Sequence, residues 1–268
     1  MNHPSNIGFI GAGRMGGPMV RRLVAAGHRV HAVGRTADKR RELAETGAHP
    51  SAGIAEIGVG ADVVIVCVFT DEQVRRVCLG TYLIPAMSPG ATLVVHTTGS
   101  PRTVEAVAEH AARRGVDVVD AAVSGGPHDI ADGRLTLFVG GADAAVARVR
   151  PVLATYADPI LPVGSLGNGR RVKLLNNAAF AAQIGVLTEI VRLAGRLGID
   201  ESTLLRALPH GSATSRALTG AAARGSVTAF VAAVDDFLTK DVAVVREVLA
   251  ELDADLGHLT PLLGDHAP

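Results

Sequence analysis

Lysine is scarce in this sequence. Among 26 lysine and arginine residues there are only three lysines, Lys39, Lys173 and Lys240, so arginine carries nearly all of the positive charge. An arginine side chain stays protonated in proteins, whereas a lysine amine can release and regain a proton. Lys173, which stands alone between the other two, is therefore either an ordinary surface cation or an amine that a site needs for proton transfer.

The sequence also lacks an excess of charge of one sign. Its 26 acidic residues balance the 26 lysines and arginines, which gives a formal net charge of zero. No overall field attracts nucleic acid or an anionic membrane surface, and neither partner is expected. Pairs of adjacent arginines are spread along the chain with acidic residues between them, and we expect most to lie on solvated helix faces. These pairs are Arg21–Arg22, Arg40–Arg41, Arg75–Arg76, Arg113–Arg114 and Arg170–Arg171.

Cysteines and long apolar runs are sparse as well. Cys67 and Cys78 have neither the pattern of a disulfide framework nor the spacing of zinc ligands, so we expect reduced cysteines and no metal site. The opening residues, MNHPSN, lack the basic-then-apolar order of a signal peptide, and the longest apolar runs are of strand length. With 268 residues, 48% of them hydrophobic, the composition predicts a soluble, cytoplasmic protein of one large or two medium domains.

Glycine, in contrast, is placed with a pattern. A short apolar run, residues 6–10, leads into GAGRMGG, which has G-x-G-x-x-G spacing and precedes a helical stretch. In a dinucleotide site the first glycine permits the tight turn, the second lets the backbone approach the pyrophosphate, and the third lets helix pack on strand. Free N–H groups at the helix start then bind phosphate. The motif predicts a dinucleotide site, against the alternative of a purely structural turn. Its residues are Gly11, Ala12, Gly13, Arg14, Met15 and Gly16.

The end of the second expected strand, residues 29–33, indicates which dinucleotide is bound. An NAD-selective site usually has an acidic residue there for the ribose 2′-hydroxyl. This sequence has Arg35 and Thr36 instead, and no acid before Asp38. A planar guanidinium can pair with a 2′-phosphate, and a threonine can add its hydroxyl. NADP is therefore favoured and NAD is possible; the alternative is that Arg35 is only a surface residue at a helix start.

Strand and helix patterns alternate over roughly the first 155 residues, which predicts an α/β fold with an N-terminal Rossmann domain built on a doubly wound, mainly parallel sheet. The expected strands are 6–10, 29–33, 62–68, 92–95, 116–119 and 135–139, and the helices between them 38–46, 71–78, 101–114 and 142–155. Ligands of such sheets bind beyond the carboxyl ends of the strands, where Val68, Phe69 and Thr98 fall.

The second half has only helical patterns. A long apolar stretch runs from Arg171 to Leu197 with polar interruptions, so it fits a buried helix better than a membrane span. Further helices are expected at 201–208, 214–223, 226–232 and 235–256. We therefore predict two domains: an NADP-binding Rossmann domain of residues 1–163, and an all-helical domain of residues 164–268 for substrate binding and dimerisation.

Lys173 and Asn177 are four residues apart on the long helix and share a face. A lysine and an asparagine facing a ligand suit a general acid and the residue that orients it. The alternative is a lysine whose stem packs along the helix while its amine reaches water. Spacing by itself leaves both interpretations open.

A second candidate loop is DAAVSGGP, residues 120–127. Ser124, Gly125 and Gly126 follow a strand and offer one hydroxyl and closely spaced N–H groups, which suit a small carboxylate. A plain turn between strand and loop is the alternative.

Several motifs, in order over about residues 6–250, resemble the β-hydroxyacid dehydrogenase family, which includes 3-hydroxyisobutyrate dehydrogenase and semialdehyde reductases. They resemble, in turn, its cofactor signature, the loop after the fourth strand, a cofactor-contact threonine, the substrate loop, the catalytic segment, and a segment whose lysine reaches the cofactor. The motifs are IGFIGAGRMGGPM, CVFTDEQV, HTTGSP, DAAVSGG, GNGRRVKLLNN and KDVAV.

The resemblance implies hydride transfer between NADP(H) and a small 3-hydroxyacid or its semialdehyde. Lys173 would be the general acid in reduction and the base in oxidation, and Asn177 would hold substrate and lysine in line. The segment Ser124 to Gly126 would bind the substrate carboxylate. The implied cofactor contacts are Gly11, Gly13, Met15, Gly16, Arg35, Thr36, Val68, Thr98 and Lys240. Such enzymes are usually homodimers or homotetramers assembled through the helical domain.

The sequence departs from the family pattern in places. Ala122 stands where the family usually has proline, Pro127 where the residue is more often aliphatic, and the chain continues as LGHLTPLLGDHAP where members commonly have a closing helix. Ala122 and Pro127 predict a differently shaped substrate loop, and the C-terminal segment bears on closure of the site and on substrate identity. His128 and His210 could line the pocket, although lone histidines near loops are more often structural.

Two alternatives of different classes remain. An imine reductase-like enzyme would use the same cofactor to reduce C=N bonds, but those relatives generally lack a lysine at the position of Lys173. A non-catalytic interaction protein of the same fold has likewise lost that lysine, which is present here. A 6-phosphogluconate dehydrogenase is disfavoured because its helical domain is much longer.

Overall fold

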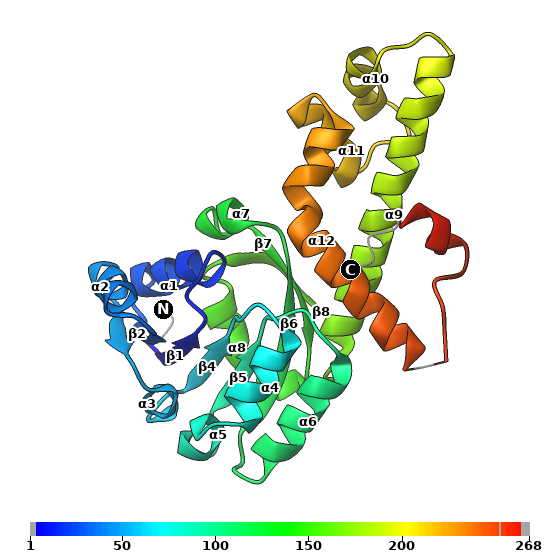
Figure 1. Cartoon of the computed structure of the whole chain (residues 1–268). Coiled ribbons are helices and arrows are strands. Elements are labelled where there is room, and N and C mark those ends of the chain that lie inside the picture. Colours follow the sequence, from blue (N-terminus) through cyan, green and yellow to red (C-terminus); the bar gives the residue numbers. More distant parts are fainter. Residues whose placement is uncertain (1–3, 252, 264–268) are drawn as a thin grey trace. The chain divides into compact units, whose positions relative to one another are not determined.

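The computed structural model describes residues 4–251 and 253–263, and the chain divides into two compact units, Met1–Lys173 and Leu174–Pro268. The first unit is an eight-stranded sheet with helices on both faces (Figure 1). Its strands are β1 (Asn6–Ile10), β2 (Arg29–Val33), β3 (His49–Ser51), β4 (Val63–Val66), β5 (Thr92–Val95), β6 (Asp117–Ser124), β7 (Leu135–Gly140) and β8 (Ala157–Pro162). Its helices are α1 (Gly16–Ala25), α2 (Ala37–Glu45), α3 (Ile54–Gly58), α4 (Asp71–Leu79), α5 (Leu83–Ala86), α6 (Pro101–Ala112), α7 (Pro127–Ala131) and α8 (Asp143–Leu153).

The strand order is β3-β2-β1-β4-β5-β6-β7-β8. Every neighbouring pair is parallel except β6 and β7, which are antiparallel. The chain winds outward in one direction from β1 and then in the other from β4, so the sheet is doubly wound and the carboxyl ends of β1 and β4 lie at its switch point. The predicted fold class is confirmed.

Alternation along the central strands explains the two layers of helices. Ile7 and Phe9 of β1 pack in one core cluster with α1 and α8, whereas Ile10 packs in another with α4, α5 and α6. The same division separates Val63 and Ile65 from their neighbours in β4. Because successive side chains of a strand point to opposite faces, a run that is apolar throughout must be covered on both sides.

The sequence did not predict strands β3 and β8 or the antiparallel direction of β7. β3 has only three residues, including Pro50, and β8 contains Pro159 and Pro162, so neither has the apolar run that marks a strand. β7 returns antiparallel to β6 because only the short α7 segment joins them, which is too short for a crossover to a parallel strand.

The second unit is helical, as predicted. It contains α10 (Glu201–Ala207), α11 (Arg216–Arg224), α12 (Val227–Ala250), the short 3-10 helices η1 (Leu208–His210) and η2 (Gly257–Leu262), and most of α9 (Asn168–Arg196). The prediction of separate helices at 226–232 and 235–256 was wrong. Val234, inside the expected break, and Leu238, after it, both pack in the core of the unit, so one helix continues through Asp235.

Within the described residues, α9 is the single helix that is long and apolar enough to cross a membrane, and 33% of its most apolar window is buried in the protein. Two consecutive helical segments, residues 216–224 and 227–235, are long and apolar enough only if they are counted together as one bent span. Core helices of soluble proteins can be equally long and apolar, and Ala181, Ile184 and Leu187 of α9 lie in the core of the helical unit.

Candidate functional site

The glycine turn after β1 fits a dinucleotide. Gly11 has a φ of +99°, and a side chain there would meet the carbonyl oxygen of Cys67 at 2.2 Å. A side chain at Gly16 would meet the Gly11 carbonyl oxygen at 2.2 Å, so only glycine lets α1 pack this closely on β1. A side chain at Gly13 would meet no atom of the described residues within 4 Å. Protein atoms therefore pack against the turn at Gly11 and Gly16, whereas the space beside Gly13 is open. Helix α1 begins at Gly16 without a side-chain cap, so N–H groups of its first turn are available to an anion.

The residues between these glycines differ in exposure. Ala12 is buried in the core of the sheet, Met15 is half-buried, and Arg14 is exposed beside Gly13. Arg14 is thus the residue of this turn whose side chain can reach a bound anion.

Arg35 and Thr36 are exposed just beyond the end of β2. The Thr36 hydroxyl accepts a hydrogen bond from the Lys39 N–H at 3.1 Å and so caps α2. Asp38, the first acid, is exposed in the first turn of α2 and pairs with Arg41 at 3.3 Å. Among the described residues directly after β2 there is therefore no carboxylate where an NAD-selective site binds the ribose 2′-hydroxyl.

Sequence reasoning missed Arg40 at this place. Its Nη1 donates to the Gly34 carbonyl oxygen at 2.8 Å, and its side chain packs so closely that a side chain at Gly34 would meet it at 2.6 Å. A second guanidinium therefore lies at the end of β2. It contacts Gly34, the residue directly before Arg35. The signal available in the sequence was the pair Arg40–Arg41, one of the pairs of which most are expected on solvated helix faces.

The loops after β4 and β5 are tied together. The Thr97 hydroxyl donates to the Val68 carbonyl oxygen at 2.8 Å and accepts from the Val68 N–H at 3.2 Å. Thr98 is 8% exposed, whereas Phe69 is 61% exposed. The Phe69 N–H donates to the Gln73 side chain at 2.9 Å, within the capping box that begins α4. The predicted contacts Val68, Phe69 and Thr98 thus belong to one hydrogen-bonded pair of loops.

The Ser124–Gly126 segment ends β6. Ser124 is half-buried opposite Thr136 of β7, and Gly125 has a φ of +133°. The Gly126 N–H donates to the Asp129 carboxylate at 2.7 Å, which closes the first turn of α7. Of the N–H groups predicted to bind a carboxylate, one is therefore already engaged by a carboxylate of the chain itself.

The departures from the family pattern have local explanations. Ala122 is fully buried inside β6, where it pairs with Phe138 of β7. Pro127 occupies the first position of α7, which suits a residue without an N–H. His128 is exposed, and it lies 3.3 Å from the Asp129 carboxylate. His210 is exposed at the end of η1 in the other unit.

The start of α9 is fixed to β6 by Asp120. This fully buried carboxylate accepts from the Gly167 N–H at 2.7 Å and from the Arg170 N–H at 2.8 Å. Burial raises the pKa of Asp120, and the two N–H donors oppose that rise. A side chain at Gly169 would meet the Phe138 carbonyl oxygen at 2.4 Å, so the helix start lies directly on the sheet. The strand that leads to Ser124 therefore also caps the helix that carries Lys173.

Lys173 and Asn177 lie one turn apart on continuous α9. Lys173 is half-buried and is the last residue of the first unit, and Asn177 is 5% exposed in the second. The Asn177 Nδ2 donates to the Asp241 carboxylate at 2.7 Å, and the Lys240 amine lies 3.5 Å from the same carboxylate. Asp241, which sequence reasoning passed over, therefore orients the Asn177 amide. Its signal was the KD pair, of which only the lysine was assigned a role.

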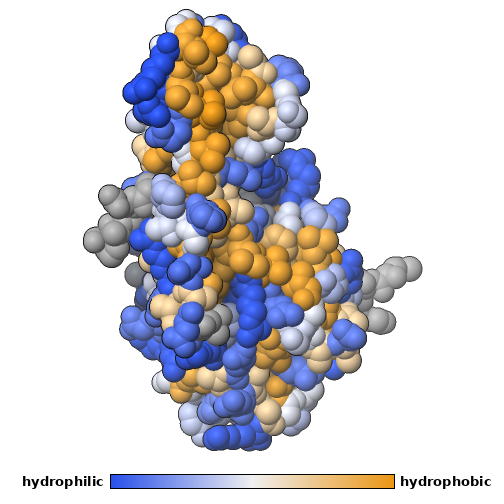
Figure 2. Space-filling view, turned by 90° about the vertical axis from the view of Figure 1, so that its right-hand side faces the viewer, coloured by the Kyte–Doolittle hydropathy of each residue, from blue (hydrophilic) through white to orange (hydrophobic). Residues whose placement is uncertain are grey.

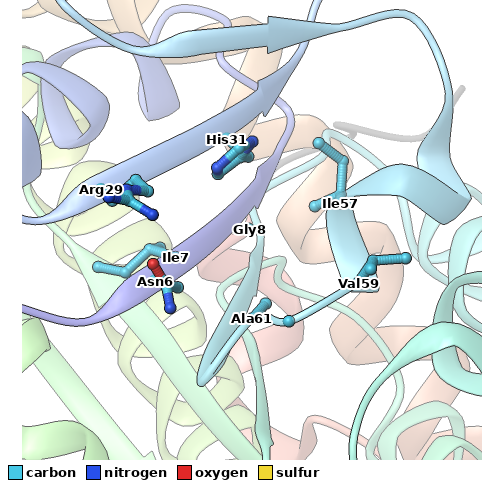
Figure 3. A pocket seen from close by; sticks show the side chains of 9 residues that line it. Asn6, Ile7, Gly8, Arg29, His31, Ile57, Val59 and Ala61 are labelled. Atoms are coloured by element: carbon cyan, nitrogen blue, oxygen red, sulfur yellow. The ribbon is translucent and has the colours of Figure 1, made fainter.

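A cavity of about 250 Å³ lies elsewhere on the first unit (Figure 3). It is lined at the amino-terminal ends of β1 and β2 by Asn6 and Arg29, and by Val59 to Ala61 just before β4 begins. Ligands of parallel sheets bind at the carboxyl ends, so this cavity does not coincide with the predicted site.

Models of two protein families match the chain. The NAD binding domain of 6-phosphogluconate dehydrogenase matches residues 6–164, and the NAD-binding domain of NADP-dependent 3-hydroxyisobutyrate dehydrogenase matches residues 167–260. The two matches meet close to the predicted boundary at 163/164. The packing boundary lies after Lys173 because the first turn of α9 is bound to β6.

Individual relatives agree with the family models. The chain is 33% identical to a 3-hydroxyisobutyrate dehydrogenase of Pseudomonas aeruginosa, over 80% of this chain and 72% of that one. It is 32% identical to an L-threonate dehydrogenase of Cupriavidus necator, over 78% and 71%. The structure of a Mycobacterium tuberculosis 3-hydroxyisobutyrate dehydrogenase with L-serine superposes with a TM-score of 0.87 at 26% identity, over 98% and 93%. An imine reductase of a Pseudomonas species, 21% identical over 97% and 92% with a TM-score of 0.71, shares the fold.

Proposed function

Because this chain belongs to the β-hydroxyacid dehydrogenase family, we propose that it transfers a hydride between NADP(H) and a small 3-hydroxyacid or its semialdehyde, with Lys173 as the proton donor and acceptor. It is an oxidoreductase acting on CH–OH groups, with NADP as cofactor and NAD possible. The observation that carries the role of Lys173 is its place on α9, one turn after a helix start that Asp120 fixes to the strand leading to Ser124.

The residues fit a nicotinamide dinucleotide. The opening at Gly13 and the uncapped start of α1 suit the pyrophosphate, and Arg35 together with Arg40 suits a 2′-phosphate. Val68, Phe69 and Thr98 would contact the remainder, and Lys240 is the further cofactor contact that the family resemblance implies. When bound, the cofactor supplies or accepts the hydride.

The chain's own residues then manage the substrate and one proton. Lys173 would protonate the substrate oxygen in reduction and take that proton back in oxidation. Asn177, held by Asp241, would keep substrate and lysine in line. Ser124 and the Gly125 N–H would bind the substrate carboxylate, while the Gly126 N–H would do so only if Asp129 releases it.

The imine reductase alternative receives less support. The similarity to imine reductases is in the fold, and the lysine that those relatives generally lack is present as Lys173. The same lysine opposes the alternative of a non-catalytic interaction protein.

Substitution of Lys173 tests the proposal. A panel of 3-hydroxyacids and short semialdehydes is assayed by absorbance with NADP(H) and NAD(H) in parallel. Lys173→Arg should keep cofactor affinity but lower kcat by about 10²- to 10⁴-fold, the usual contribution of a positioned general acid. Lys39→Arg, at a half-buried lysine paired with Glu42, is the matched control and should retain activity. Near-wild-type turnover by Lys173→Arg would contradict the assignment.

Cofactor choice is tested at Arg35. Arg35→Asp removes a cation and adds a charge that repels a 2′-phosphate, so the Kd for NADP should rise by about 10- to 100-fold while that for NAD changes little. Arg41→Asp, at an exposed arginine of α2 that pairs with Asp38, is the control. Equal losses for both cofactors would count against selectivity through Arg35.

We further propose that the protein is a cytoplasmic homodimer or homotetramer assembled through its helical unit. The support is a stripe of exposed apolar residues on α9 and just beyond its end, visible as orange atoms in the upper part of Figure 2. The stripe consists of Val186, Ile190, Leu193 and Leu197.

A further inference from the structure

Arg170 is a completely buried arginine at the start of α9, an exception among the arginine pairs, most of which are expected on solvated helix faces. Its Nη1 donates to the Asp71 carboxylate at 2.6 Å and to the Ser100 carbonyl oxygen at 2.7 Å. Its backbone N–H donates to Asp120. A single residue thus joins α9 to the loop after β4, to the loop after β5 and to β6.

The loops that Arg170 joins are those with predicted cofactor contacts. Asp71 begins α4, directly after the segment Val68 to Thr70, and Ser100 ends the segment that contains Thr98. The Thr103 hydroxyl also donates to Asp71, so the carboxylate is held from α6 as well. Lys173 lies three residues after Arg170 and is its neighbour on the helix surface.

Stabilisation of the fold is a poor explanation for this arginine. Its Nε and Nη2 have no hydrogen-bond partner among the described residues, although both are buried. Burial lowers the pKa of Arg170, while the Asp71 carboxylate opposes that effect. A buried ion pair left partly unsatisfied is often less stable than apolar side chains of the same volume. The geometry that the guanidinium imposes is a better reason for its presence.

We propose that Arg170 is a positioning residue, which holds the first turn of α9, and with it Lys173, in a fixed place against the loops that carry Val68, Phe69 and Thr98. The proposal rests on the proposed function, since it gives Lys173 a cofactor-bound substrate to act on. Arginine suits the task better than lysine because the N–H groups of Nη1 are fixed in the guanidinium plane and bind both acceptors in one geometry, whereas a lysine ammonium rotates freely.

The experiment compares Arg170→Met, Arg170→Lys and Asp71→Asn with Arg171→Met as the control. Arg171 is the adjacent, half-exposed arginine, and its side chain pairs with Glu105 of α6 at 2.8 Å and not with Asp71 or Ser100. Each variant is assayed below its unfolding temperature for kcat, KM and the Kd of NADPH. Misplacement of a reacting group by about 1 Å can cost about 100-fold in rate. Arg170→Met should therefore lose about that much kcat, with partial recovery in Arg170→Lys and little change in Arg171→Met.

A second comparison separates positioning from a structural role. If Arg170 acts through Lys173, Arg170→Met should lower kcat much less in a Lys173→Arg background than in the wild type, because the two losses are not additive. Equal losses in both backgrounds, or wild-type kcat in Arg170→Met, would overturn the proposal while leaving the proposed function intact. If Arg170→Met does not fold, Arg170→Lys and Asp71→Asn carry the same comparison.

Failure of the proposed function is recognised separately, because the wild type would then turn over no member of the substrate panel. In that case the Kd of NADPH decides. A weaker affinity in Arg170→Met than in Arg171→Met would support the tie between α9 and the cofactor loops, and equal affinities would overturn it.

Discussion

At the scale of single residues, buried polar groups of the first unit are held in defined states by their partners. His96 ends the apolar run of β5 and is 1% exposed. Its Nδ1 lies 2.6 Å from the Ala121 carbonyl oxygen, which can only accept, so that nitrogen carries the proton. Its Nε2, 2.9 Å from the Tyr156 hydroxyl, is then the acceptor. Burial lowers the pKa of His96 to about 4. The ring is therefore neutral at physiological pH, and it joins the end of β5 to the strand of the substrate loop.

His96 should make stability depend on pH. The unfolded chain protonates this histidine near pH 6.5, whereas the folded protein does so near pH 4, so the stabilisation is present above pH 6.5 and is lost as the pH falls toward 4. Between pH 7 and pH 5 the free energy of unfolding should fall by about 2 kcal/mol through this residue. Urea denaturation of the wild type and of His96→Asn at both pH values measures the difference.

Tyr156→Phe is the control for that experiment. It removes the hydroxyl but leaves the imidazole buried, and burial is the main cause of the lowered pKa. Tyr156→Phe should therefore keep the pH dependence that His96→Asn loses. The same pH dependence in wild type and His96→Asn would show that other groups cause it.

At the scale of elements, α9 has two different faces. Ala181, Ile184 and Leu187 pack in the helical core, while Val186, Ile190 and Leu193 are exposed at spacings of four and three residues. Such spacing places the exposed side chains in one stripe along the helix. An exposed apolar stripe of this kind is typical of a surface that another protein covers.

The stripe predicts the oligomeric state. If a second copy of the chain covers it, Ile190→Glu combined with Leu193→Glu should convert the dimer or tetramer to a smaller species in analytical ultracentrifugation. Ala223→Glu, at an exposed position of α11, adds charge away from the stripe and should leave the assembly intact. A monomeric wild type, or a double variant that stays assembled, would exclude this interface.

At the scale of the whole molecule, family membership and substrate choice depend on different features. The fold is shared over nearly the whole chain, even with an imine reductase at 21% identity, so architecture does not select the reaction. Under the proposed function, a few side chains select the reaction, with Lys173 foremost. The predicted substrate loop, where Asp129 engages Gly126 and Ala122 replaces proline, is one place where this chain departs from its family pattern.

The sequence by itself determined the features that depend on local patterns. The glycine spacing predicted the turn at Gly11, alternating apolar runs predicted the doubly wound sheet, and helical spacing placed Lys173 and Asn177 on one face. Each of these signals lies within a few residues, where backbone geometry dictates the periodicity.

The tertiary structure alone decided which distant side chains meet. Arg170 and Asp71 are 99 residues apart in the sequence, and Asn177 and Asp241 are 64 apart. No local periodicity distinguishes a buried arginine from the exposed one beside it. The choice depends on whether packing brings a carboxylate within reach and removes water from the guanidinium, and only the folded chain determines that.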